Sequence, residues 1–188
     1  PVGMLNEYHE PTLFWSVERP EVERVVIPTT WQELGFGMKT RFLEERLKYR
    51  AYVVQAADAS KFTGATGIRG GRGLGGRQTN ASNPAFVHRA EYAPDLGDDI
   101  DLDLGASHYW APAAGQEHRS ATGTMSEDMQ GVGVQIHEAD GRVRAYGLDL
   151  RGTYAVVDLA NAAKLNRALA TGSTATIASD LQKSYKAR

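Results

Sequence analysis

The sequence predicts an all-β fold in which antiparallel strands follow one another as an up-and-down meander. Two observations lead to this prediction. Apolar and polar side chains alternate along most segments between residues 29 and 159, and the connections between these segments are alternately short and long. Helical periodicity is confined to one short stretch near the end of the chain. We therefore expect a single, mainly β domain over residues 1–188.

The clearest alternation lies in DIDLDLGASHYW, residues 99–110. Successive side chains of a strand leave opposite faces of its sheet, so period two indicates an extended strand. One face of this strand is apolar and the other is acidic. The apolar set is Ile100, Leu102, Leu104 and Ala106, and the opposite set is Asp99, Asp101, Asp103 and Ser107.

Similar segments recur along the chain and, with its opening, predict about seven strands. In PAFVHRAEYAP the pattern is weaker, because His88 interrupts the apolar face. The stretch LANAAKLNRALA, residues 159–170, predicts a short helix with Asn161 as a cap. The further strand segments are TTWQELGFGMK (29–39), RLKYRAYVVQA (46–56), PAFVHRAEYAP (84–94), GVGVQIHEADGRVRAY (131–146) and GLDLRGTYAVVDL (147–159).

The dipeptide Asp140-Gly141 leaves two interpretations of residues 132–145 open. Asp-Gly is a strong hairpin signal, so this stretch could form two short strands. The alternation keeps its phase through the dipeptide, with charged residues on one face throughout. This continuity favours one long strand, which then ends in a tight turn at Tyr146-Gly147.

The segregation of short and long connections favours one kind of barrel. Tight turns at one end and long loops at the other are the organisation of outer-membrane barrels, whose strands alternate lipid-facing apolar and lumen-facing polar residues. A soluble sandwich or barrel shows the same alternation, with its apolar face on a protein core. The apolar residues that would meet either hydrocarbon or such a core include Leu102, Leu104, Leu148 and Leu150.

Composition excludes several other classes. The chain has a formal net charge of −2 and no cysteine, so it indicates neither a polyanion-binding protein nor a disulfide framework. No apolar run approaches the roughly 20 residues of a spanning helix. The opening residues lack the pattern of a signal peptide, and there is no initiator methionine. We expect a piece of a longer protein.

Three stretches resemble outer-membrane porins of the phosphate-selective porin O and P family of Gram-negative bacteria: PVGMLNEYHEP, FWSVERPEVERVVIPTTWQELGFGM and YGLDLRGTYAVVDLANAAKLNRAL. The similarity extends from Pro1 to about Gln182. It implies an antiparallel transmembrane barrel of about sixteen strands, assembled as a homotrimer, that passes small polar or anionic solutes such as phosphate. The chain has fewer strands and ends in LQKSYKAR without an aromatic strand, so we expect an internal fragment, incomplete at both ends.

If lipid lies outside such a barrel, the polar faces of its strands line the lumen. Opposed rows of charge across a water-filled pore select solutes by charge. The candidate pore-lining residues are the cations Arg46, Lys48, Arg50, Arg142, Arg144 and Arg151 and an acidic wall opposite them of Asp99, Asp101 and Asp103.

The glycine-rich stretch GIRGGRGLGGRQ, residues 67–78, bridges two predicted strands. Repeats of Arg-Gly-Gly bind RNA in disordered segments, but one short copy without interleaved aromatic residues favours an extracellular or constriction loop. Folded into the pore, Arg69, Arg72 and Arg77 would attract anions. We expect no nucleic-acid partner.

No motif indicates an enzyme. Glu7, His9 and Glu10 do not converge in an extended chain, because Glu10 points away from the other two. Nucleophile-elbow, zinc-binding and nucleotide-binding motifs are absent from the sequence, so we expect no catalytic residue, metal or cofactor. Aromatic residues near the segment ends match an interfacial girdle, namely Tyr8, Phe14, Trp15, Trp31, Tyr109, Trp110 and Tyr146.

These observations predict a passive channel in the outer membrane of a Gram-negative bacterium, surrounded by lipid and carrying small polar or anionic solutes. The alternative prediction is a soluble β-barrel or sandwich that binds a ligand. Aliphatic side chains packed under a second layer of protein would favour the alternative.

Overall fold

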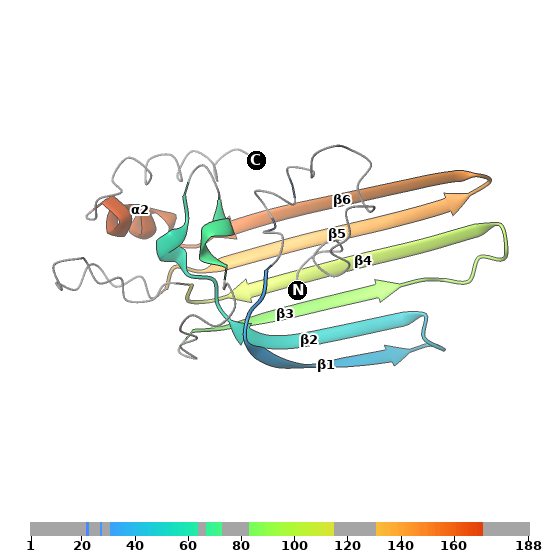
Figure 1. The fold of residues 1–188 in the computed structure, drawn as a ribbon, viewed down its shortest axis with the longest axis horizontal. Coiled ribbons are helices and arrows are strands. Elements are labelled where there is room, and N and C mark those ends of the chain that lie inside the picture. Colours follow the sequence, from blue (N-terminus) through green and yellow to red (C-terminus); the bar gives the residue numbers. More distant parts are fainter. Residues whose placement is uncertain are drawn as a thin grey trace.

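The computed structural model describes residues 22, 27, 31–63, 67–72, 83–114 and 131–170, without the side chains of 167–170. These residues form one antiparallel sheet of six strands whose spatial order follows the sequence (Figure 1). The predicted all-β antiparallel meander is thus confirmed, as an open sheet with β1 and β6 at its edges. The strands are β1 (Gly35–Phe42), β2 (Leu47–Gln55), β3 (Pro84–Tyr92), β4 (Ile100–Ala111), β5 (Val134–Ala145) and β6 (Leu148–Leu159).

Each strand forms where alternation predicts it. The weaker segment around His88 is β3, and β5 continues through Asp140 and Gly141, which confirms the single long strand. The predicted helix is α2 (Ala162–Ala170), and the side-chain amide of Asn161, just before it, donates to the carbonyl of Gly131 at 2.7 Å. No helix among the described residues is long and apolar enough to span a membrane. The opening of the chain lies outside the described residues.

Short and long connections lie at opposite ends of the sheet, as predicted. Residues 43–46, 93–99 and 146–147 connect strands at one end, which we call the turn end. Residues 56–63, 67–72, 112–114 and 131–133 and α2 lie at the other, the loop end (Figure 1). Tyr146 and Gly147 have φ of 52° and 83°. Positive φ at both central residues is the type I′ geometry of a two-residue hairpin, whose twist matches that of the strands.

The two faces of the sheet differ in chemistry. The register pairs Asp103 with Arg142 and Arg142 with Arg151, so charged residues of β4, β5 and β6 share one face, which we call the charged face. Because successive side chains of a strand point to opposite faces, the residues between these charged positions lie on the other face, which we call the apolar face. Its exposed large side chains include Phe36, Met38, Phe42, Leu104, Trp110, Leu148, Leu150 and Tyr154.

The hydrophobic core lies at the loop end of the charged face, where the strands become apolar. Tyr109 of β4 and Ile136 of β5 are buried there. The connection after β2, which contains the short helices η3 (Ala59–Lys61) and η4 (Ile68–Gly71), adds Phe62 and Ile68 to the same cluster. Leu165 of α2 completes it. This connection therefore packs on the charged face.

Two residues of the predicted aromatic girdle belong to this core instead. Tyr109 is buried on the charged face, and its hydroxyl accepts a hydrogen bond from the Ala57 N–H at 2.9 Å. Trp31 packs against the Tyr109 ring, with centroids 4.9 Å apart. The girdle assignment of these two is wrong, because the phase of β4 directs Tyr109 inward. Trp110 and Tyr146 are exposed.

Replacing Gly147 with alanine tests the hairpin between β5 and β6. A Cβ at Gly147 would meet no atom within 4 Å, so the cost is conformational. We expect the left-handed φ to lower the free energy of unfolding of the full-length protein by about 1–2 kcal/mol. Gly152→Ala is the matched control, because its Cβ also meets open space and its φ lies outside the left-handed region. Equal losses in denaturant unfolding would contradict this account.

Candidate functional site

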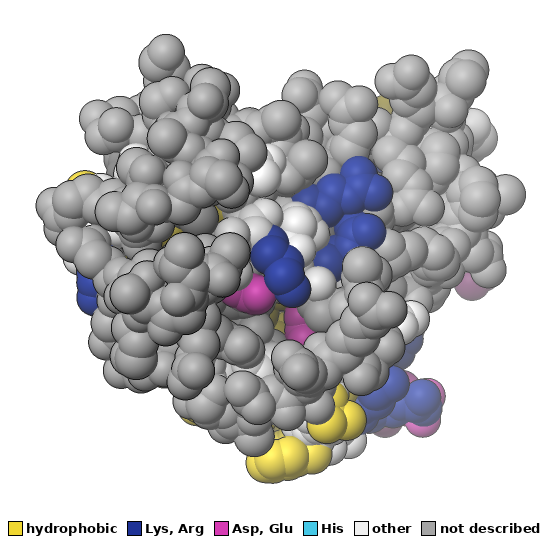
Figure 2. Space-filling view, turned by 60° about the vertical axis from the view of Figure 1, so that its left-hand side comes forward, with side chains coloured by type: hydrophobic (Ala, Val, Ile, Leu, Met, Phe, Trp, Pro, Cys, Tyr) yellow, Lys and Arg dark blue, Asp and Glu magenta, His cyan; other side chains and the backbone are white. Residues whose placement is uncertain are grey.

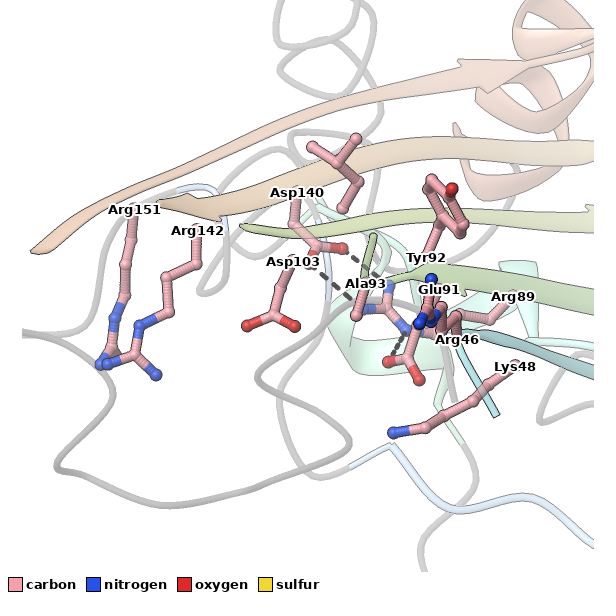
Figure 3. Close-up of a pocket in the computed structure, with 11 residues that line it drawn as sticks. Arg46, Lys48, Arg89, Glu91, Tyr92, Ala93, Asp103, Asp140, Arg142 and Arg151 are labelled. Atoms are coloured by element: carbon pink, nitrogen blue, oxygen red, sulfur yellow. Dashed lines mark hydrogen bonds and ion pairs between the residues drawn. The ribbon is translucent and has the colours of Figure 1, made fainter. Parts of the chain in front are cut away.

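Charged side chains concentrate on the charged face between the core and the turn end. There they surround a cavity of about 280 Å³ (Figure 3). Cations from β2, β5 and β6 stand around acidic residues from β4 and β5. The cavity is lined by Arg46, Lys48, Arg89, Glu91, Tyr92, Ala93, Asp103, Leu104, Asp140, Arg142 and Arg151.

Arg89 of β3 pairs with three carboxylates although its side chain is only 3% exposed. Its guanidinium nitrogens lie 3.0 Å from Glu91 Oε1, 3.2 Å from Glu138 Oε2 and 2.8 Å from Asp140 Oδ2. The guanidinium also donates to the hydroxyl of Ser107 at 2.8 Å. A buried charge is tolerated when its hydrogen bonds are satisfied in this way.

Two small residues of β4 make room for these contacts. β3 and β5 flank β4, so their backbones lie roughly 9–10 Å apart and the side chains must meet above β4. A Cβ at Gly105 would lie 2.3 Å from Asp140 Oδ2 and 2.6 Å from Arg89 Nη2. Ser107, two residues along on the same face, supplies a hydroxyl. The Gly-Ala-Ser sequence of β4 thus permits the ion pair between its neighbours.

Arg50, one of the predicted pore-lining residues, extends the network to β2. Its guanidinium lies 2.6 Å from Glu91 Oε2, and both side chains are largely buried. The network therefore contains two guanidiniums and three carboxylates. We call Arg50, Arg89, Glu91, Ser107, Glu138 and Asp140 the Arg89 cluster.

A second set of ion pairs lies nearer the turn end. Arg142 makes a two-point contact with Asp149 at 3.0 and 2.5 Å, and Arg151 lies 3.4 Å from the same carboxylate. Arg144 of β5 pairs with Asp101 of β4 at 3.0 Å. These side chains are partly exposed, so water screens their attraction more than in the Arg89 cluster.

Five of the predicted pore-lining residues meet at the cavity. Lys48 and Asp103 form no ion pair with another described residue, so their charges are the least neutralised there. Arg46 is bound to Asp95 at 3.0 Å. The five are Arg46, Lys48, Asp103, Arg142 and Arg151.

The predicted acidic wall does not stand opposite the arginines across open space. Asp101 and Asp103 lie on β4 directly beside β5, because the register pairs them with Arg144 and Arg142. Asp99 lies in the turn before β4, near Asp101 and Arg144 at the turn end. The expectation of two facing rows is corrected to adjacent strands of opposite charge.

Two of the three predicted loop arginines are described, and both lie at the loop end. Arg69 belongs to η4 and Arg72 follows it, whereas Arg77 lies outside the described residues. Burial lowers the pKa of the Arg72 guanidinium, and the positive charge of Arg69 lowers it further. With the loop end turned forward, lysine and arginine side chains gather at a hollow in which acidic side chains are visible (Figure 2).

The described residues hold no group of three or more histidine, aspartate or glutamate side chains suited to a metal ion. His88, His108 and His137 form a row on the apolar face, with ring centroids 6.3 and 4.6 Å apart and nearly parallel planes. The nitrogen lone pairs lie in the ring planes, and nearly parallel stacked planes do not meet at one point, so the three rings do not converge on one tetrahedral site.

Sequence reasoning did not single out Arg89, Glu91, Glu138 or Asp140 as site residues. Their charges at alternate positions of a strand were visible, since residues 89 and 91, and 138 and 140, each share a face. Alternation does not show which strands are neighbours or how they are aligned. Only the register places these two pairs on either side of Gly105.

Comparison with known proteins finds a relative in Aquifex aeolicus. The chain is 32% identical over 177 residues to an uncharacterized protein of Aquifex aeolicus (strain VF5). The match covers 91% of this chain but spans only 36% of the length of that relative. No family model and no solved structure matches the chain.

Gly105→Ala tests whether the ion pair between Arg89 and Asp140 depends on the open space above β4. The added methyl group would meet both charged groups. We expect the free energy of unfolding to fall by about 1–3 kcal/mol, the cost of separating buried hydrogen-bonding partners. Gly141→Ala on β5 is the matched control, because its Cβ would lie an ordinary 3.5 Å from Leu104. Comparable losses in both variants would argue against this packing.

Proposed function

We propose that the chain forms part of the wall of an outer-membrane channel, through which small polar or anionic solutes such as phosphate diffuse passively. The apolar face contacts lipid, and the charged face lines the aqueous passage. One observation carries the proposal: the hydrophobic core and the exposed apolar surface lie on opposite faces of the same sheet.

The apolar face supports this proposal by its exposure. Phe36, Leu150 and Tyr154 are 76%, 55% and 71% exposed, on strands at both edges of the sheet. Monomeric soluble proteins rarely expose contiguous apolar patches of more than a few hundred Å². In the described part of the chain, no second layer packs on these side chains. An outward apolar band of this kind is typical of a membrane barrel.

Strand length and aromatic placement agree with a membrane environment. β4, β5 and β6 each contain 12 residues, whereas strands of globular proteins mostly have about 5–6. Tilted strands of about 9–11 residues cross a bilayer. Exposed aromatic side chains stand at both ends of the strands, Phe42, Tyr92 and Tyr146 at the turn end and Phe36 and Trp110 at the loop end. Two such bands are typical of membrane barrels.

The charged face supports an aqueous passage that discriminates by charge. Lys48 and Arg142 stand on two sides of the cavity and Asp103 lies between them (Figure 3). Closely spaced charges of both signs create a local field that acts on passing solutes. Residues 56–63 and 67–72 pack on this face, so they narrow the passage at the loop end and bring Arg69 and Arg72 there.

Closure of a barrel requires further strands. β1 and β6 have no outer neighbour among the described residues. Pairing with strands from the rest of the protein would remove both open edges. The Aquifex relative has room for such strands, since the chain matches 36% of it. The homotrimer and the Gram-negative outer membrane are proposed from the sequence resemblance.

Ion conductance tests the channel. The full-length protein, reconstituted into planar lipid bilayers, should produce stepwise increases in current, and its purification should require detergent. The alternative class, a soluble β-barrel or sandwich that binds a ligand, predicts a monodisperse protein in plain buffer and no conductance. That pair of results would overturn the proposal.

Arginine substitutions at two adjacent positions of β6 test the orientation of the sheet. Tyr154→Arg places a charge on the apolar face, and we expect it to destabilise the bilayer-folded protein by about 2–4 kcal/mol. Thr153→Arg places the same charge on the charged face, where water solvates it, and should cost much less. Folding titrations in lipid vesicles measure both. Equal effects of the two variants would show that the apolar face does not contact lipid.

A further inference from the structure

We propose that Arg89 determines the charge selectivity of the passage without touching the solute. This inference rests on the proposed channel function. Arg89 is only 3% exposed and is surrounded by the carboxylates of Glu91, Glu138 and Asp140. A solute on the charged face therefore meets the carboxylates of Glu91 and Asp140, whereas Glu138 is fully buried, and the guanidinium acts by cancelling part of their charge.

Three of the six residues of the Arg89 cluster line the cavity, and we call the cluster its floor. Arg89, Glu91 and Asp140 belong to its lining, and the dashed contacts in Figure 3 join the guanidinium to both carboxylates. Glu91 and Asp140 keep 16% and 7% of their side chains exposed. Their charges lie at the cavity surface, so a change in the neutralisation of either carboxylate changes the field there.

The charges of the floor are nearly balanced. The guanidiniums of Arg50 and Arg89 stand against three carboxylates. Burial and the neighbouring Asp140 carboxylate raise the pKa of Glu138 to about 7, so loss of Arg89 would leave one guanidinium against the carboxylates of Glu91 and Asp140 and a partly protonated Glu138. The floor would then repel anions and attract cations. A cluster with a purely structural role would instead change stability and leave the selectivity unchanged.

The reversal potential of the full-length protein in a potassium chloride gradient across a planar bilayer measures this role. Arg89→Met removes the buried positive charge. We expect the chloride-to-potassium permeability ratio to fall by about four- to thirtyfold, because one unit charge at roughly 4–10 Å in water changes the occupancy of each ion by about two- to sixfold, in opposite directions. Asp140→Asn removes one carboxylate and leaves Arg89 paired with Glu91 and Glu138. We expect the ratio to rise by a similar factor.

The double variant Arg89→Met/Asp140→Asn restores the net charge of the cluster. Its permeability ratio should return toward that of the wild type. Two disruptive substitutions at one buried site would not cancel in this way if the effect were structural. Asp140→Asn keeps three of the contacts of Arg89, so its opposite shift tests the proposal even if Arg89→Met does not fold.

Arg41→Met is the matched control. Arg41 pairs with Glu45 at 2.9 Å, its side chain is 61% exposed, and it does not line the cavity. Removal of this screened charge should leave the permeability ratio unchanged. Unchanged ratios in Arg89→Met and Asp140→Asn, with a wild type that conducts, would overturn the role of Arg89 alone. A wild type that does not conduct would overturn the channel and this role together.

Discussion

Strand register is the constraint on which the arrangement of this protein depends. Side chains alternate between the faces of a sheet, so a slip of one residue would exchange charged and apolar groups. Asp103 stands opposite Arg142 on one face, and the neighbouring Leu104 stands opposite Gly141 on the other. Opposite charges and apolar groups therefore favour the same alignment. The Arg89 cluster depends on it, because its members come from β2, β3, β4 and β5.

The strands and their order were predictable because the signals for them are local. The alternation of apolar and polar residues is visible within one segment. It located each of the six strands, including β3 with His88 on its apolar face. The continuous phase through Asp140 and Gly141 outweighed the turn tendency of that dipeptide. Loop lengths, also visible along the chain, placed the turns at one end and the long connections at the other.

The partners of the charged residues were not predictable, because they depend on long-range alignment. Asp103 was assigned to a wall facing the arginines, yet it lies beside Arg142 on the next strand. Arg89 lies in the predicted strand with the weakest alternation of apolar and polar residues. Its contacts depend on the space above Gly105, and a single glycine in a strand does not reveal such contacts in the sequence. The inward packing of Tyr109 depends on the connection after β2, which contains Ala57. The alternation of residues within strands does not predict where this connection lies.

The open sheet has a consequence for the chain when it is produced alone. β1 and β6 run in opposite directions and expose unpaired backbone groups among the described residues. The β6 edge of one copy is then complementary to the β1 edge of the next, in the antiparallel sense. Such head-to-tail contacts close into a ring only where the curvature of the sheet allows it, and otherwise isolated copies would polymerise into ribbons. Covalent continuity with flanking sequence would keep this assembly tendency within one molecule.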